Sequence, residues 1–555
     1  MINRIDRPFP EMEEIEKEVL GSDSNEPPQN NHRQQRPELV LPSGYVEYSA
    51  TARNMFPVLA KRRRFFVRGH ALVEIAYQKL LKDRQLHDVF QLLEADALRS
   101  RIEKDFACRV WREENHQYVL KPGRCTGDTA RVLLKTDEAF EFLPSINTLS
   151  AAPVLTGEQG KLEILTKGYH DINGGIFVSH GDAVLLPELD EARRLILEAV
   201  GDFDFVSEAD KSRAVASFIS PALRAGRLLG EVDCPIDIGE ANESQSGKTF
   251  RQKLVCAVYG ETPYVIASRD GGVGSLDESI SSALIAGIPF IFFENFRGQM
   301  RSQLVETCLR GLGWAPARVP HKGEIQVPTA HINWLLSSNG LEATRDFVNR
   351  AIISRICKRD SNHPFKQYPE GNILSHIKAN QVEYLGAVFR IIKEWDNRGR
   401  PGTNETRHDF REWAQALDWI IQNLFELAPL IDGHAEEVLR VSDPALSWLR
   451  QVAIVIEKTK GLDQAYSASE IVDICQAKGI ELPGSRAIVN SDQLSMHGGR
   501  MLGRLFSDHD QVEIDRYQIK RDPRTEYRQD GQSFEKNYYW FRKRGTSNIE
   551  QRRAH

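Results

Sequence analysis

The sequence predicts an α/β protein built on a parallel sheet flanked by helices, with a mixed α+β region before it and a small helical and β unit after it. Three observations lead to this fold class. A polar loop ending in Gly247-Lys248-Thr249 stands between an apolar run and a helical pattern. Two further apolar runs follow at near-equal intervals and end in polar residues, at Glu294-Asn295 and at Ser338-Asn339. Strands that alternate with helices in this way are typical of parallel sheets.

Composition restricts the class of protein. The chain has 555 residues, of which 41% are hydrophobic and 27% charged, values typical of a globular protein with roughly two to four domains. No apolar run approaches the ~18 residues of a membrane span, and the N-terminus lacks the apolar core of a secretory signal. We therefore expect a cytoplasmic protein with no membrane partner. The seven cysteines include no CxxC pair, which argues against a disulfide framework and a zinc site, and the net charge of -6 neither demands nor excludes nucleic acid.

The N-terminal part is expected to be a disordered tail over residues 1–43, which are polar and proline-bearing, followed by an α+β domain over residues 44–200. Within that domain Lys61–Tyr77 has the pattern of a hairpin. Its basic residues either contact phosphates or form the solvated face of an edge strand. Apolar recurrence at three and four residues predicts a helix over residues 88–106. Residues 152–181 predict short strands joined by glycine-rich turns.

Residues 201–395 are expected to form the central domain. It opens with an amphipathic helix after Ser207, a predicted N-cap. The segment EANESQSGKTF then has the parts that a phosphate-binding loop needs. Loop amides would converge on a phosphate, the helix N-terminus would face the anion, and Lys248 would reach the β- and γ-phosphate oxygens. The first glycine of GxxxxGK[ST] is replaced by Asn242, but asparagine tolerates positive φ. The alternative is an accidental GKT in a solvated turn.

Polar residues at the ends of the next two predicted strands fit the same chemistry. Glu294 ends the apolar run GIPFIFFEN, where a nucleotide hydrolase places an acid that holds Mg²⁺ through water. Asn339 ends the run AHINWLLSSN, where its amide could orient an attacking water. Each residue also has a plain structural alternative: Glu294 could pair with Arg297, and Asn339 could serve a turn with Gly340.

A predicted helix over residues 341–356 carries Arg345, Arg350 and Arg355 at intervals of five. Arginine at a subunit edge is well suited to stabilise the charge of phosphoryl transfer in a neighbour's site. The sequence leaves open which of the three would act in this way. The alternative is that they coat a solvated helix face.

Together these stretches resemble the helicase half of phage and plasmid primase-helicases, close to the superfamily 3 helicases of the AAA+ class. The likeness runs from about Arg53 to Gln422. FFVRGHALVEI is similar to the family's RGG-LV-I element, and APVLTGEQGKLEILTKGYHDINGGIF to its P-L-GY-D--TG segment. DESISSALIAGIPFIFFENFRG resembles its magnesium-site strand, SSNGLEATRDFVNRAIISRI its GNN element, and FREWAQALDWII the helix behind the motor.

The resemblance implies an AAA+-like P-loop ATPase core that uses ATP and Mg²⁺. It also implies a homo-oligomeric ring, expected to be a hexamer, acting on single-stranded or forked DNA. A primase portion before Arg53 is not expected, so a separate primase or polymerase would be the partner.

Carried onto this sequence, the resemblance assigns nucleotide binding to eight loop residues. They are Asn242, Glu243, Ser244, Gln245, Ser246, Gly247, Lys248 and Thr249. Thr249 and Glu294 would hold Mg²⁺, and the catalytic set would be Lys248, Glu294, Asn339 and Arg350. Asn242 stands for a glycine, Glu294 for the usual aspartate, and Asn349 for the first of two arginines. These departures leave a slow or nonhydrolytic ATPase open.

The C-terminal third is expected to comprise a helical region over residues 396–465, opening with an exposed loop, and a winged-helix-like domain over residues 466–555. Ser467 and Glu470 have capping-box spacing, and a second helix and two strand-like runs follow. One helix would enter the major groove while the wing touches phosphate. The predicted DNA contacts are Arg500, Arg504, Arg542 and Lys543, with Tyr539 or Trp540 stacking on a base. The alternative is a unit that makes only protein contacts and keeps its aromatic residues in its core.

Two functions follow from this interpretation. The first is an ATP-dependent DNA helicase or translocase in the replication of a phage-like or mobile element, with ATP hydrolysed between the subunits of a ring. The second is an ATP-binding, DNA-associated assembly or regulatory protein that uses the nucleotide as a switch without unwinding.

Overall fold

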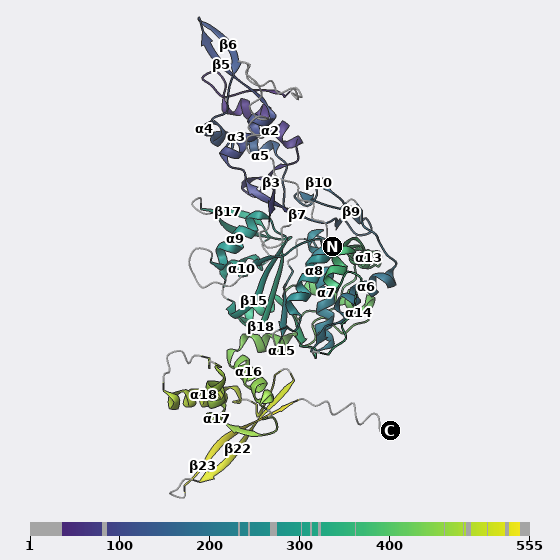
Figure 1. Cartoon of the computed structure of the whole chain (residues 1–555), viewed down its shortest axis with the longest axis vertical. Helices are drawn as coiled ribbons and strands as arrows, with labels where there is room; N and C mark the ends of the chain where they lie inside the picture. The colour runs from purple at the N-terminus through teal and green to yellow at the C-terminus, as the bar shows by residue number, and fades with distance from the viewer. Residues whose placement is uncertain are drawn as a thin grey trace, which may run out of the picture. The chain divides into compact units, whose positions relative to one another are not determined.

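The computed structural model (Figure 1) describes most of the chain. The described ranges are 36–79, 86–181, 183–230, 234–241, 245–266, 275–300, 302–310, 313–319, 323–360, 362–459, 461–480, 482–483, 490–507, 509–514, 516–527 and 532–543. The first 35 residues of the expected tail lie outside these ranges. So do Asn242, Glu243 and Ser244 of the predicted phosphate-binding loop.

The chain divides into two compact units. The first comprises Met1–Met55 and Glu94–Glu138, and the second comprises Phe56–Leu93 and Ala139–His555. The five-part division expected from the sequence stays a prediction. Among the described residues, no helix combines the length and apolarity that crossing a bilayer requires.

The first unit holds a small sheet and short helices. Its elements are β1 (Glu38–Val40), α3 (Ala95–Asp105), β5 (Ala107–Glu114), β6 (Gln117–Pro122) and α4 (Gly127–Leu133), while α2 (Tyr48–Lys61) and α5 (Asp137–Phe142) extend past its boundaries. The sheet order is β1-β5-β6, with β1 parallel to β5. In α4 the Thr126 side chain caps the helix by accepting from Thr129 N.

The second unit begins with an antiparallel sheet of β2 (Phe65–Arg68), β3 (Ala71–Lys79) and β4 (Leu86–Leu92). The hairpin expected within Lys61–Tyr77 is confirmed, because β2 pairs with β3 across the turn at Gly69, which has a φ of 61°. The single helix expected over residues 88–106 is wrong in its first part. Residues up to Leu92 pair with β3, and only the Leu98 and Ile102 spacing belongs to a helix, α3.

Short strands follow, as the glycine-rich turns predict. They are β7 (Thr148–Ser150), β8 (Val154–Thr156), β9 (Glu163–Leu165), β10 (Gly168–His170) and β11 (Ile176–Val178). The sheets they form are β10-β11-β7 and β8-β9.

A six-stranded sheet is the centre of the second unit. Its strands are β12 (Asp204–Phe205), β13 (Ile236–Ala241), β14 (Tyr264–Ile266), β15 (Phe290–Met300), β18 (Asn333–Ala343) and β19 (Ala351–Cys357). Their order is β12-β19-β13-β18-β15-β14, and every pairing is parallel except that of β12. All six residues of β13 are buried, as in a parallel strand covered on both faces.

Helices cover both faces of this sheet (Figure 1). One face packs against α6 (Leu189–Gly201), α7 (Glu208–Ala225), α8 (Lys248–Val258), α12 (Ile373–Ala379), α13 (Gln381–Asn397) and α14 (Arg411–Leu424). The other packs against α9 (Leu276–Ala286), α10 (Gln303–Cys308), α11 (Arg345–Asn349), α15 (His434–Ser442) and the hairpin of β16 (Trp314–Val319) and β17 (Gly323–Pro328). The expected cap of α7 is confirmed, since the Ser207 side chain accepts from Asp210 N at 3.1 Å.

The helix expected over residues 341–356 is wrong. The chain stays in β18 to Ala343, forms one short helix, α11, and then enters β19. The reason is burial, because Ile352 packs into the core on one face of the sheet and Ile353 into the core on the other. A β-branched run buried on alternate sides favours a strand. Arg355 therefore lies on a strand.

The loop after α13 is not exposed throughout, contrary to expectation. Arg400 donates to Asp396 Oδ1 at 2.6 Å and to the carbonyl oxygens of Leu228 and Gly157 at 2.9 and 3.0 Å. His408 is also buried. These partly buried hydrogen bonds hold the loop against the turn after α7 and the segment after β8.

The C-terminal part has its own apolar core. Its elements are α16 (Pro444–Lys458), β20 (Ala465–Ser467), α17 (Ala468–Lys478), α18 (Ser491–Leu505), β21 (Gln511–Ile514), β22 (Tyr517–Tyr527) and β23 (Ser533–Lys543). The sheet order is β20-β23-β22-β21, and all pairings are antiparallel. The capping box is confirmed, with Ser467 and Glu470 each accepting from the other's backbone N–H.

The fold predicts that the free energy of unfolding depends on pH through Glu261. This carboxylate accepts a hydrogen bond from Ala151 N at 2.8 Å, and desolvation raises the pKa of Glu261 to about 7. A carboxyl group whose pKa is raised on folding stabilises the fold below its unfolded pKa and loses that contribution as the pH rises toward 7. We expect Glu261→Gln to remove a fall in unfolding free energy on the order of 2 kcal/mol between about pH 4.5 and 7.5.

Denaturant unfolding at several pH values checks this, with the exposed Glu163→Gln as the control. The same pH-dependent fall in wild type and in Glu261→Gln would contradict the assignment.

Candidate functional site

At the carboxyl edge of the central sheet, the end of β13 lies beside interior positions of β18 and β15, which both continue past it. The expected end of the strand at Glu294-Asn295 is therefore wrong, because β15 runs on to Met300. Gly239 of β13 pairs with Ser337 of β18, and Phe293 of β15 pairs with Leu336. The connection after β13 runs to α8 on one face of the sheet, and the connection after the neighbouring β18 runs through α11 on the other. In open parallel sheets, ligands bind outside the carboxyl ends of strands where neighbouring connections diverge in this way.

The loop between β13 and α8 lies at this edge. Gln245 and Gly247 have φ angles of 62° and 92°, both left-handed, and Lys248 is the first residue of α8. Lys248 is 5% exposed. Ser246 Oγ is buried and makes no hydrogen bond within the described ranges. The first turn of a helix also leaves N–H groups available to an anion, so the residues present suit a phosphate group.

A buried serine that the sequence analysis missed connects the loop to the next strand. Ser337 Oγ lies 3.2 Å from Thr249 Oγ1 and accepts a hydrogen bond from Asn295 N at 3.0 Å. Asn295 has a φ of 51° at a bulge where β15 shifts register against β18, and bulges commonly re-aim side chains next to active sites. Ser337 thus sets the position of Thr249 relative to Glu294-Asn295. The sequence feature that could have identified Ser337 is the pair of small polar residues, Ser337 and Ser338, at the end of an otherwise apolar run before Asn339.

The predicted metal ligands are oxygen donors on neighbouring elements. Glu294 is partly exposed, and its Oε1 lies 3.8 Å from Lys253 Nζ of α8. Across the described residues, no group of three or more His, Cys, Asp or Glu side chains could hold a metal ion. A magnesium ion here would therefore take ligands from Thr249 and Glu294 together with water and phosphate oxygens, which is the usual manner of Mg²⁺. The Arg297 side chain, the expected alternative partner, lies outside the description.

Asn339 is exposed, but it neither ends its strand nor makes a turn. β18 continues to Ala343, and Leu341 still pairs with Gly298 of β15. Both sequence interpretations of the backbone at Asn339 are therefore wrong. The residue still follows Ser338, which pairs with Glu240 at the end of β13, so it lies at the same edge as the loop.

The three predicted arginines lie in different places. The carbonyl oxygen of Arg350 accepts from Ile236 N, at the first residue of β13, and its NH1 pairs with Asp346 at 2.6 Å. Lys248, in contrast, packs beside Gly239 toward the other end of that strand. Arg345 is exposed. Arg355, on β19, pairs with Glu437 Oε1 at 2.7 Å.

A buried charge cluster, which we call the Glu240 cluster, lies directly before the loop. It consists of Glu240, Arg355, Glu437 and Arg440. Glu240 is fully buried and accepts from both terminal nitrogens of Arg440 and from Leu341 N. Arg440 also donates from Nε to Glu437 at 3.0 Å. Sequence reasoning missed this cluster because α15, which carries Arg440, is far from β13 in the chain.

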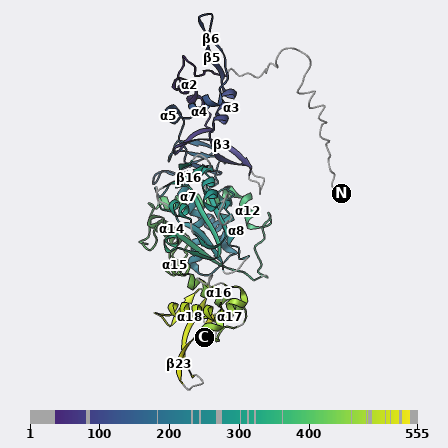
Figure 2. The same cartoon turned by 90° about the vertical axis from the view of Figure 1, so that its left-hand side faces the viewer.

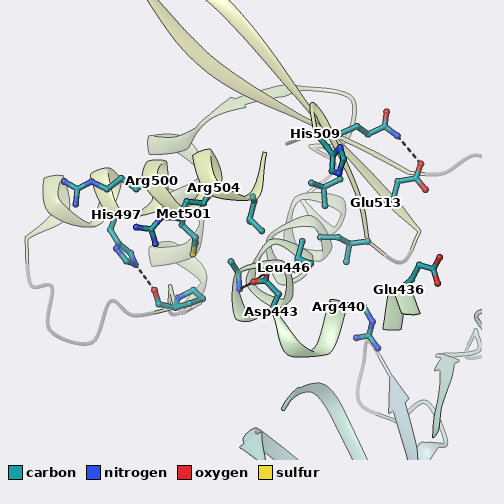
Figure 3. A pocket seen from close by; sticks show the side chains of 16 residues that line it. Glu436, Arg440, Asp443, Leu446, His497, Arg500, Met501, Arg504, His509 and Glu513 are labelled. Carbon is teal, nitrogen blue, oxygen red and sulfur yellow. Dashed lines mark hydrogen bonds between the residues drawn. The ribbon is translucent and has the colours of Figure 1, made fainter. Parts of the chain in front are cut away.

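The predicted DNA contacts divide between two elements. Arg500 and Arg504 are exposed on α18 and line a cavity of about 810 Å³ together with His497 and Met501 of the same helix and Leu446 of α16 (Figure 3).

The other two predicted contacts lie on β23 and differ from each other. Arg542 is 55% exposed, whereas Lys543 pairs with Glu457 of α16 at 3.0 Å. Of the two aromatic candidates, Tyr539 is 2% exposed and packs on Phe506, so its expected stacking on a base is wrong. Trp540 is partly exposed.

No protein-family model matches the chain, and no curated protein matches it. Among solved structures it is similar to the apo A form of the NrS-1 C-terminal region, at 11% identity and a TM-score of 0.30, over 70% of this chain and 80% of that one. It is also similar to SCCmec type IV Cch, described as an active helicase, at 11% identity and a TM-score of 0.30, over 86% and 97%. Likeness at this distance carries no argument about function.

The loop geometry predicts that Gly247 cannot be replaced. A Cβ there would lie 2.9 Å from Phe203 Cε1 on a backbone with a φ of 92°. We expect Gly247→Ala to lower the unfolding free energy by about 1–3 kcal/mol through backbone strain. Thermal or denaturant unfolding measures this. The matched control is Gly201→Ala at the exposed end of α6, where a Cβ meets nothing within 4 Å; equal effects of the two changes would refute the strained loop.

Proposed function

We propose that this chain is an ATP-dependent DNA helicase or translocase whose ATP site is the loop between β13 and α8. One observation carries the proposal. Lys248 opens α8 directly after the left-handed Gly247, and Thr249 is tied through Ser337 to the bulge at Glu294-Asn295. A lysine, a hydroxyl group and an acid are thereby gathered beside the carboxyl end of β13, as phosphoryl transfer requires.

In this proposal the chain's own residues hold and orient the phosphates. The loop amides and Lys248 bind phosphate oxygens, and the Ser246 hydroxyl, which makes no hydrogen bond to any residue that the structure describes, gains a partner. Thr249 and Glu294 are the residues that would hold Mg²⁺, which would neutralise phosphate charge. The exposed Asn339 amide would position the attacking water.

The placement of Arg350 supports an assembly in which it acts on a neighbour. Its backbone lies beside the first residue of β13, away from the Lys248 end of the strand, so it does not face the site of its own chain. Arg355 is the weaker candidate because its partner Glu437 is buried, whereas Asp346, the partner of Arg350, is 53% exposed. A homo-oligomeric ring, proposed to be a hexamer, would bring Arg350 to the adjoining site.

The DNA contacts are proposed to come from the C-terminal part, as a winged-helix-like unit with Arg500, Arg504 and Arg542 exposed. The setting we propose is replication of a phage-like or mobile element in the cytoplasm, beside a separate primase or polymerase.

A second function, a nucleotide switch without unwinding, is favoured by one observation. Glu294, the proposed acid, lies 3.8 Å from Lys253 Nζ, and an opposing charge competes with a metal ion for a carboxylate. DNA-stimulated ATP turnover favours the motor, whereas ATP binding without stimulated turnover favours the switch.

Lys248→Ala tests the ATP site. We expect ATP turnover to fall about 10²- to 10³-fold, the usual cost of removing one group that stabilises transition-state charge, with the melting temperature little changed. The control is Lys378→Ala, an exposed lysine on α12, which should leave turnover intact. Turnover that survives in Lys248→Ala would exclude this loop as the ATP site.

Mixing two inactive variants tests the shared site. If Arg350 completes a neighbour's site, Lys248→Ala and Arg350→Ala are each inactive, but mixed assemblies contain sites with Lys248 from one chain and Arg350 from the next. Turnover should then reappear on mixing. Arg345→Ala mixed with Lys248→Ala identifies which arginine serves. The absence of any recovery, with both variants folded and assembled, would show that Arg350 does not act across subunits.

A further inference from the structure

The β22–β23 hairpin has two faces of opposite character. Its outer face, as we call it, is defined by alternate residues that pair across the strands. They are Gln518 with Arg542, Lys520 with Trp540, Asp522 with Tyr538, Arg524 with Lys536, and Glu526 with Phe534. Side chains of directly paired residues lie on the same side of a sheet, so these ten share one surface.

The other face is the core-facing one at the base of the hairpin. Ile519, Tyr539 and Phe541 lie on it and are at most 2% exposed. The outer face is therefore turned away from the apolar core of the C-terminal part. Both views show the hairpin reaching beyond α17 and α18 (Figures 1 and 2). Only the base of the hairpin is needed to close that core.

On the outer face, cations lie over aromatic rings. The Arg524 guanidinium lies 4.8 Å from the centre of the Tyr538 ring and Lys536 Nζ lies 5.3 Å from it. The Arg542 guanidinium lies 5.5 Å from the centre of the Trp540 ring. These cations are 40% to 55% exposed, and each also pairs with a carboxylate: Arg524 with Asp522 at 3.0 Å, Lys536 with Glu526 at 3.7 Å and Arg542 with Asp463 at 3.4 Å. Exposed ion pairs contribute little to stability, so phosphate groups can replace these partners at small cost.

The polar edges of the same rings are held in place. Trp540 Nε1 donates to Asp522 Oδ2 at 3.0 Å, and the Tyr538 hydroxyl donates to Glu526 Oε1 at 2.5 Å. A ring fixed by its edge keeps its flat face presented without losing side-chain entropy on binding. The outer face thus combines aromatic rings of fixed orientation with positively charged side chains.

We propose that the outer face of this hairpin binds single-stranded DNA, with bases stacking on Tyr538 and Trp540 and with Lys520, Arg524, Lys536 and Arg542 contacting phosphates. The four cations are balanced by Asp522 and Glu526 on the same face, by Asp463, which pairs with Arg542, and by Glu513, which is opposite Gln518 on β21. The attraction to single-stranded DNA therefore comes from cations placed beside the rings and not from an excess of positive charge. Flat rings flanked by cations recognise unstacked bases, which a duplex does not offer. The choice of DNA rests on the proposed function, but nothing in this site depends on ATP.

The first test measures binding of a fluorescent oligothymidylate of about 16 nucleotides, near the upper site size of a single stacking module, to the full chain without nucleotide. Tyr538→Ala and Trp540→Ala should each weaken binding about 5- to 150-fold, the loss expected for one stacked base, while Trp540→Phe should retain most of the affinity. The matched control is Tyr527→Ala, a 75% exposed tyrosine on the other face of the hairpin, which should bind as wild type does.

If the paired aromatic residues have only a structural role, the binding experiment gives a different result. If the aromatic residues only stabilise the hairpin, Tyr538→Ala and Trp540→Ala bind the oligonucleotide no more weakly than Tyr527→Ala does, and the proposal fails. It also fails if a duplex of the same length binds as tightly with the same dependence on Trp540.

The second test does not depend on how well the aromatic variants fold. The double variant Lys536→Gln with Arg542→Gln removes two exposed cations, and it should reduce the slope of log affinity against log salt by about 1.4, because each single-strand phosphate contact contributes about 0.7. Lys478→Gln, an exposed lysine at the end of α17, should leave the slope unchanged. An unchanged slope in the double variant overturns the proposal.

The two proposals fail separately. Lys248→Ala should keep full oligonucleotide affinity, so loss of turnover in that variant leaves the outer face intact. Loss of binding in Tyr538→Ala leaves ATP turnover without DNA intact.

Discussion

The insertion of β18 between β13 and β15 is the constraint on which the candidate site depends. These strands are distant in sequence, and only their parallel register places Ser337 between Thr249 and the Asn295 amide. Ser337 shares a face with Leu335, which packs toward α8, whereas Leu336 packs into the opposite core. A slip of one residue that moves Leu336 into this position would therefore replace the serine with an apolar side chain.

Buried polar contacts hold α8 against this sheet. Arg251 donates to Asp237 Oδ1 and to Ser217 Oγ, each at 2.7 Å, and Gln252 Nε2 donates to the carbonyl oxygen of Asp237 at 3.1 Å. An ion pair with additional hydrogen bonds in a dry interior is costly to break. The N-terminus of α8, with Lys248 at its start, consequently keeps a fixed direction relative to β13, and a helix N-terminus attracts an anion only along its axis.

Features with a local cause could be predicted from the sequence. Ser207 and the Ser467–Glu470 pair predict helix starts, because each serine side chain accepts a hydrogen bond from the backbone N–H three residues further along. The apolar run before Glu294 predicts a buried strand. The segment from 341 to 356 could not be assigned, because a short apolar run has no period that separates strand from helix. Its burial on both faces of the sheet decided the outcome.

Features with a long-range cause left no trace in the sequence. Arg440 meets Glu240 only because α15 packs against β18, and nothing near either residue signals its partner. The same applies to the two faces of the C-terminal hairpin. Adjacent residues such as Tyr539 and Trp540 look equivalent in sequence, yet the alternation of a strand buries one and leaves the other on the outer face.

The Glu240 cluster connects the segments that surround the loop between β13 and α8. One buried carboxylate receives Arg440 of α15 and the amide of Leu341, two residues beyond Asn339, while it sits on the strand that ends in the loop. Removing any one partner would leave a buried charge uncompensated, at a cost of about 3–5 kcal/mol. The end of β13, the strand segment after Asn339 and α15 are thereby joined through one buried side chain, and α16, which follows α15 after a single residue, packs in the core of the C-terminal part.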